Sequence, residues 1–217
     1  MRHILLCLLS VFAASSLFAE GMPFPAPKRA KEEWRENINT ALAKKGNVDF
    51  DKKPLPDAIK ALKELLGVNF VIDPANAPKA ETLVTLKQKD IVLSEALKQT
   101  LAKGEMAYQV QDGAIFIYHT KKTDMEMLRP EELPVARIMD GREEQLDFQP
   151  TNEEAGELLK QLTEPAGMKL AMVDELKKKP ITLELKNVRL GHAIRWLYRF
   201  AGGKIEVKTD GMTIVKR

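Results

Sequence analysis

Apolar positions along the chain follow helical and strand periods in a fixed order. In VDFDKKPLPDAIKALKELLGVNFVIDP, Leu55, Ile59, Leu62 and Leu66 recur at helical spacing, and apolar residues then alternate with polar ones over 68–72. Spacing of three and four residues is typical of an amphipathic helix, and alternation is typical of a strand with one buried face. The pattern therefore predicts a short strand, a helix that Gly67 ends, and a second strand.

The following stretch completes one structural unit. LVTLKQKDIVLSEALKQTLAKGEMAYQVQDGAIFIYH predicts a strand over 83–86, a helix with Leu93, Leu97 and Leu101 on one face, and a hairpin. The hairpin is expected to turn at Asp112-Gly113, because Asp-Gly is favoured in two-residue type I′ turns. The unit therefore has the order β-α-β-β-α-β-β.

The same pattern occurs a second time. LDFQPTNEEAGELLKQLTEPAGMKLAMVDE and PITLELKNVRLGHAIRWLYRFAGGKIEVKTDGMTIVK match the first unit in order, at an offset of about 98 residues. Asp147-Phe148 matches Asp49-Phe50, and Asp210-Gly211 matches Asp112-Gly113. Self-similarity at such a period indicates tandem domains. We therefore expect an α+β fold of two small domains, residues 46–119 and 143–217, each with two helices packed on small mixed sheets.

Two segments lie outside the repeats. Residues 20–45 contain a predicted helix with Trp34, Ile38 and Leu42 on one side, which we expect to pack on the first domain; a free partner-binding arm is the alternative. Residues 120–142 are charged and contain Pro130 and Pro134, so they predict a linker, with one strand at 135–138. In the second domain, Thr151 and Glu154 form a capping-box pattern at the expected helix start.

The N-terminus has the features of a secretory signal peptide. A short basic start precedes an apolar run over 4–18, and small residues surround the expected cleavage after Ala19. An uncleaved N-terminal anchor is the alternative. Cys7 lies inside the apolar run, so we expect no lipidated cysteine at the cut. No later stretch approaches the roughly twenty apolar residues of a membrane span, so no integral membrane insertion is expected after cleavage.

The charge balance and the cysteine content disfavour nucleic-acid binding, disulfides and thiolate metal sites. Lys and Arg number 34 and Asp and Glu 31, a balance that does not favour nucleic acid as a partner. Cys7, the only cysteine, leaves with the signal, so neither a disulfide nor a thiolate metal site is expected in the mature chain.

The repeated motif resembles a known family. The first copy carries VDFDKKPLPDAIKALKELLGVNFVID and VTLKQKDIVLSEALKQTLAKGEMAYQV, which resemble the short N-terminal domain of secretins and TonB-dependent receptors. In the second copy, Gln149-Pro150-Thr151-Asn152 and Gly191-His192 depart from the pattern. The resemblance implies a periplasmic protein-binding module whose partners are envelope proteins, with no catalytic residues and no cofactor. We expect two tandem copies without a barrel or channel, so only the binding role carries over.

The residues also predict that the chain is not an enzyme. Ser94 is the only serine after the signal, and its place at a helix start indicates a cap or exposed position rather than a nucleophile. His119 and His192 lack a third ligand at motif spacing, which disfavours a metal site. The repeated aspartates, Asp49 with Asp147 and Asp73 with Asp174, are interpreted as strand ends and caps. A hydrolase using Ser94, His119 or His192 remains the minor alternative.

One helix face in the second copy differs from its counterpart. His192, Trp196 and Arg199, with Phe200 at the boundary, stand where the first copy has Glu95, Gln99, Ala102 and Lys103. Tryptophan and arginine are enriched at protein interfaces, so these four residues are candidates for partner binding. Packing of this face on the first domain, the linker or the Trp34 helix is the alternative. Exposed sheet edges are a second candidate.

These observations favour an exported periplasmic protein–protein binding or adaptor module, associated with a secretion, pilus or outer-membrane uptake assembly. The alternative is a stand-alone module that binds a small ligand or a cell-wall glycan between the two domains.

Overall fold

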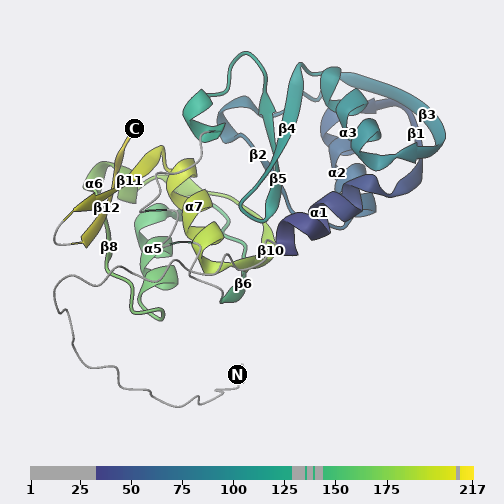
Figure 1. Cartoon of the computed structure of the whole chain (residues 1–217). Helices are drawn as coiled ribbons and strands as arrows, with labels where there is room; N and C mark the ends of the chain where they lie inside the picture. The colour runs from purple at the N-terminus through teal and green to yellow at the C-terminus, as the bar shows by residue number, and fades with distance from the viewer. Residues whose placement is uncertain (1–32, 129–134, 136–138, 140–143, 209–210) are drawn as a thin grey trace, which may run out of the picture.

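A computed structural model describes residues 33–128, 135, 139, 144–208 and 211–217 (Figure 1). The expected signal peptide and its cleavage after Ala19 lie outside these residues. Among the helices that the structure describes, none is long and apolar enough to cross a membrane.

Within the described residues, the first half contains three α-helices and five strands. In chain order they are α1 (Glu33–Ala43), β1 (Lys45–Pro54), α2 (Leu55–Leu66), β2 (Phe70–Ile72), β3 (Leu83–Val92), α3 (Leu93–Ala102), β4 (Met106–Gln111) and β5 (Ala114–His119). Short 3-10 helices lie at Pro74–Asn76 and Met125–Leu128.

The second half follows the same order, but two pairs of short strands replace the long strands β1 and β3. Its described elements are β6 (Gln145–Phe148), β7 (Glu153–Glu154), α5 (Ala155–Thr163), β8 (Leu170–Met172), α6 (Asp174–Lys177), β9 (Pro180–Ile181), β10 (Leu185–Arg189), α7 (Leu190–Phe200), β11 (Gly203–Lys208) and β12 (Gly211–Lys216).

Strand pairing is the same in both halves. In the first, β1 pairs antiparallel with β3, while β5 lies between a parallel β2 and an antiparallel β4. In the second, β6 and β7 pair antiparallel with β10 and β9, while β12 lies between a parallel β8 and an antiparallel β11. The mixed sheets and the separate helices confirm the predicted α+β class.

Helix α2 forms where the apolar spacing predicts it. Leu55, Ile59 and Leu62 are buried, and Pro56 lies in the first turn, where its missing N–H would have no partner within the helix. Gly67 ends the helix in the left-handed region at φ 65°, and its N–H donates to the carbonyl of Lys63. The predicted helix stop is therefore confirmed.

The start of α5 differs from its prediction. The helix begins at Ala155, and Glu154 precedes it in an extended conformation without a side-chain cap hydrogen bond. Glu153 and Glu154 instead pair with Ile181 and Pro180 as β7. The capping-box interpretation was wrong because strand pairing holds these residues extended.

The N-terminal helix packs on the first half. Ile38, Ala41 and Leu42 are buried in the first hydrophobic cluster, and Trp34 packs against its border. The prediction that this helix packs on the first domain is therefore confirmed for α1, Glu33–Ala43.

The predicted linker also contributes to a core. Val135 is helical rather than extended, so the predicted strand is wrong at that residue; residues 136–138 lie outside the described part. Val135 and Met139 are buried in the second hydrophobic cluster, and the Met139 carbonyl lies against Gly191 of α7. Part of the predicted linker therefore packs into the core of the second half through these two apolar side chains.

The two hydrophobic clusters meet at the β2-β5-β4 sheet. Ile115 and Ile117 face the first cluster, together with α2 and α3. Val71, Ala114 and Phe116, from the same sheet, belong to the second cluster with α7. Figure 1 shows this sheet between the helices of the first half and α7. One sheet is therefore covered on its two faces by the two halves.

Candidate functional site

The β4–β5 hairpin ends in a turn that reaches the second half. Asp112 and Gly113 have φ values of 46° and 72°, and Gln111 pairs with Ala114 on either side of them. Two successive positive φ values define a type I′ turn, as the Asp-Gly dipeptide predicts. The turn places the Asp112 carboxylate in front of α7.

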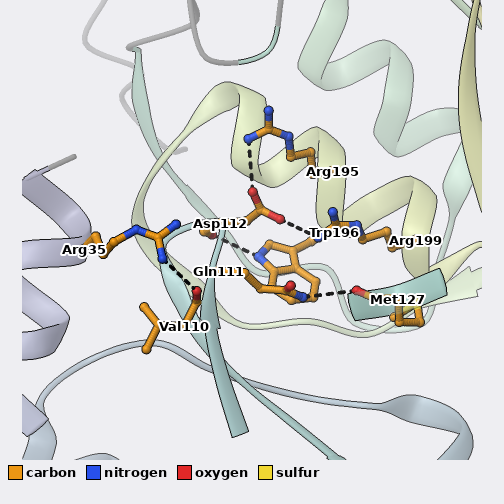
Figure 2. Close-up of polar contacts among 8 residues, drawn as sticks. All are labelled: Arg35, Val110, Gln111, Asp112, Met127, Arg195, Trp196 and Arg199. Carbon is orange, nitrogen blue, oxygen red and sulfur yellow. Dashed lines mark hydrogen bonds and ion pairs between the residues drawn. The ribbon is translucent and has the colours of Figure 1, made fainter. Parts of the chain in front are cut away.

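Asp112 is held by three side chains from α7 (Figure 2). Arg195 Nη1 lies 3.0 Å from Asp112 Oδ1, Arg199 Nη1 donates to Oδ2, and the Trp196 indole N–H donates to the Asp112 carbonyl at 3.0 Å. Residues four apart lie on one helix face, so Arg195 and Arg199 can each donate to one oxygen of the same carboxylate. We call Asp112, Arg195, Trp196 and Arg199 the junction cluster.

The junction cluster is withdrawn from solvent. The side chains of Asp112, Arg195 and Arg199 are 10%, 7% and 5% exposed, and Trp196 is fully buried. A buried carboxylate is costly unless opposite charges and hydrogen bonds compensate it. Burial by itself raises the pKa of Asp112, but Arg199 and Arg195 outweigh it and hold that pKa below its ordinary value. Asp112 is therefore ionised at neutral pH and fixes the turn to α7.

Aromatic packing surrounds the ion pairs. The Trp196 ring lies 5.3 Å from that of Phe116, on the neighbouring strand β5, and 6.2 Å from that of Phe200. The Arg199 guanidinium lies 5.7 Å from the Trp196 ring centre. Fully burying an aromatic side chain of this size is a large hydrophobic contribution, so the junction combines apolar burial with a directed polar contact.

Asn69 makes a second polar contact across the junction. Its amide nitrogen donates to the Lys186 carbonyl at 2.9 Å, and the Lys186 N–H donates to its amide oxygen at 2.9 Å. The amide nitrogen also lies 3.3 Å from the Gly113 carbonyl. The Asn69 side chain thus satisfies the backbone of β10 as a neighbouring strand would. A nearby ion pair, Lys63 with Glu184 at 2.6 Å, is solvent-exposed and contributes little.

Helix α1 and the segment after β5 also contact the residues next to the Asp112 turn. Arg35 Nη1 donates to the Val110 carbonyl at 3.3 Å, and Gln111 Nε2 donates to the Met127 carbonyl at 3.4 Å (Figure 2). The Trp34 and His192 rings meet edge to face at 5.1 Å. Elements far apart in sequence therefore converge on the Asp112 turn.

The structure corrects the predicted partner-binding face. His192, Trp196 and Arg199 are buried against the first half, and Phe200 is partly buried beside Trp196. Packing within the chain, the alternative interpretation, therefore accounts for this face. Sequence reasoning missed Asp112, Arg195 and Asn69, because a turn aspartate and a loop asparagine look solvated when their distant partners are unknown. The four-residue spacing of Arg195 and Arg199 around Trp196 was the available signal.

The repeated aspartates have partners within the fold. Asp73 is buried, caps the 3-10 helix by accepting from the Ala75 N–H at 3.0 Å, and accepts from the Thr123 hydroxyl at 2.6 Å. Asp147 accepts from the Asn187 N–H at 2.8 Å. Asp49 and Asp174 are exposed and pair with lysines.

The candidate reactive residues lie in separate elements. Ser94 is in the first turn of α3, His119 ends β5 and lies 3.8 Å from Glu105, and His192 is in α7. Across the residues that the structure describes, no three His, Cys, Asp or Glu side chains are grouped to hold a metal ion.

Comparisons with known proteins add little to this description. No protein-family model matches the chain, and no curated protein matches it. A search of solved structures found one titled "Structure of XcpQN012", with 14% sequence identity and a TM-score of 0.29, covering 73% of this chain and 96% of that chain.

Proposed function

We infer that this chain is an exported, periplasmic protein–protein adaptor of a cell-envelope assembly for secretion, pilus formation or uptake. The observation that carries the proposal is the junction cluster, which joins two α+β units into one body. Buried ion pairs and a shared sheet give the two units a fixed relative orientation. A fixed pair of domains suits a protein that holds partner surfaces at a set spacing.

The resemblance of both copies to the short N-terminal domain of secretins and TonB-dependent receptors supports the same function. The signal-peptide pattern before Ala19 supports export. The resemblance concerns domains whose implied work is docking, so the working parts are expected to be surfaces.

The sheet face that packs on α7 in the first half differs from the corresponding sheet face of the second half. Val71 and Phe116, which cover α7 in the first half, correspond by strand register to Ala171 and Thr213 in the second. Val71 and Phe116 are buried, whereas Ala171 is exposed and Thr213 partly exposed. This face of the second sheet lacks the large apolar residues that would cover another helix. The described junction therefore has no counterpart on the corresponding face of the second sheet.

The alternative function, a ligand bound between the two domains, is less well supported. Trp196, Phe116 and the buried ion pairs fill the described junction, so the space where that ligand would bind contains side chains.

Site-specific photocrosslinking in the native host tests the adaptor proposal. A photoreactive residue would replace one exposed side chain at a time on each half, such as Lys60, Glu64, Glu157 and Lys204. We expect light-dependent adducts with a defined envelope protein from clustered positions, in the periplasmic fraction. A full set of exposed positions that gives no adduct, or a chain that stays in the cytoplasm, would contradict the proposal.

A further inference from the structure

A groove runs beside the long strand β3 in the first half. Among the described strands, β3 pairs only with β1, so its other edge has no strand partner. Part of β3 lines the groove together with residues at the end of α3. The groove has a volume of about 350 Å³. It is lined by Val84, Thr85, Leu86, Gln99, Ala102 and Lys103.

The groove exists because α3 carries smaller side chains than α7. Both helices begin directly after a strand, at Leu93 and Leu190, so Gln99, Ala102 and Lys103 correspond to Trp196, Arg199 and Phe200. In the second half, this helix face is covered by the Asp112 turn. In the first half, Ala102 and Lys103 are exposed. The face that accepts a polypeptide segment in one unit is therefore open in the other.

The lining fits an extended peptide backbone. The edge of a strand presents unpaired N–H and C=O groups, which another strand can pair with. Of the lining residues on β3, Val84 and Leu86 are buried and Thr85 is exposed. Leu83 adds an apolar side chain that is 52% exposed at the start of the same strand. Backbone pairing and alternating side-chain contacts are thus both available along β3.

The charge of the lining favours an acidic occupant. The six lining residues include one cation, Lys103, and no carboxylate. Lys103 is exposed and, within the described residues, forms no ion pair. The nearest acidic residue on this helix face, Glu95, accepts a hydrogen bond from Gln99 at 3.0 Å.

We propose that the groove between β3 and α3 binds an extended, acidic peptide segment of a protein partner, which adds to β3 as a further strand. This inference rests on the proposed adaptor function and names the surface and the kind of segment that it recognises. The second half does not offer the same site, because the larger Trp196, Arg199 and Phe200 and the Asp112 turn occupy the corresponding helix face.

Nuclear magnetic resonance of the full mature chain, titrated with short synthetic peptides, tests this site. The probes are a peptide of alternating valine and glutamate, its lysine counterpart, and a glutamate version with N-methylated backbone amides that cannot pair. We expect the glutamate peptide to shift the signals of Thr85, Ala102 and Lys103 and to slow amide exchange in β3. The other two peptides are expected to bind at least about tenfold more weakly, through lost attraction or lost backbone pairing.

Two pairs of variants locate the binding surface. Ala102→Trp fills the groove and is expected to weaken binding at least about tenfold, whereas Lys98→Trp, on the same helix outside the lining, leaves binding within about twofold. Lys103→Glu is expected to weaken binding more than Lys98→Glu, because only Lys103 lines the groove. Amide spectra of each variant show whether the fold is retained.

Defined results would overturn the inference. Equal binding by Ala102→Trp, equal binding of the methylated peptide, or signal changes confined to another surface would each do so. Loss of self-association in Ala102→Trp without any peptide binding would assign the groove to a second copy of this chain instead. Crosslinks to an envelope partner that persist unchanged in Ala102→Trp would overturn this inference alone and leave the adaptor function standing.

Discussion

The indole N–H of Trp196 donates to the backbone carbonyl of Asp112 at 3.0 Å, across 84 residues of sequence. This bond joins the hairpin turn of the first half to the central helix of the second. Because Trp196 is fully buried and Asp112 also binds two guanidinium groups, the contact is apolar, ionic and directional at once. It makes the junction the part of the molecule where substitutions should have the largest effects.

Replacing Asp112 by alanine should strongly destabilise the chain. The change leaves Arg195 and Arg199 buried without their carboxylate, and breaking a buried ion pair in this way costs about 3–5 kcal/mol. Chemical denaturation followed by circular dichroism measures the loss. Asp49→Ala is the matched control, since the Asp49 side chain is 79% exposed; it should change the free energy of unfolding by less than about 1 kcal/mol. Equal effects of the two substitutions would refute the structural role of the junction cluster.

Trp196→Ala should cost about 3–5 kcal/mol, because it removes a fully buried aromatic ring and leaves a cavity beside Phe116. Trp196→Phe keeps most of the apolar volume and loses the hydrogen bond to Asp112, so its cost should be smaller. Thermal and denaturant unfolding of the two variants separate the packing contribution from the polar one. A stable Trp196→Ala variant would show that this face is not internal.

Gly113→Ala should be more damaging than Gly67→Ala. Both glycines have positive φ, 72° and 65°, which costs a residue with a Cβ about 1–2 kcal/mol. A Cβ at Gly113 would also lie 3.0 Å from His192 Nδ1, whereas a Cβ at Gly67 meets no atom within 4 Å. The difference in unfolding free energy between the two variants measures the close approach of the turn to α7. No difference would mean that the turn is not seated there.

Acid should remove the contribution of Asp112 to stability. Its pKa in the folded chain is below the ordinary value of 3.8, so the stabilisation is complete above that value and is lost as pH falls through the folded pKa. The difference in unfolding free energy between the wild type and Asp112→Asn should therefore be constant near neutral pH and shrink below about pH 4. Denaturant titrations of both proteins across this range test the prediction. If the difference in unfolding free energy instead increased as the pH fell, the pKa of Asp112 would be raised in the folded chain and not lowered.

Several local features of the fold could be predicted from the sequence, because their causes are local. The stop of α2 at Gly67 needs only a left-handed residue after an apolar stripe, and the turn at Asp112-Gly113 needs only two residues that tolerate positive φ. Other local patterns were overridden. Thr151 and Glu154 match a capping box, yet strand pairing with Pro180 and Ile181 holds Glu153 and Glu154 extended.

Periodicity and turn chemistry depend on neighbours along the chain, so they were sufficient to predict the α+β class, the order of the elements and the similarity of the two copies. The burial of Trp196 and Arg199, the ion pairs of Asp112 and the open face of α3 beside β3 depend on contacts between distant segments, so they became visible only in the folded chain. A polar side chain in a sequence has no stated partner, and its burial becomes favourable only when folding brings an opposite charge within hydrogen-bond distance.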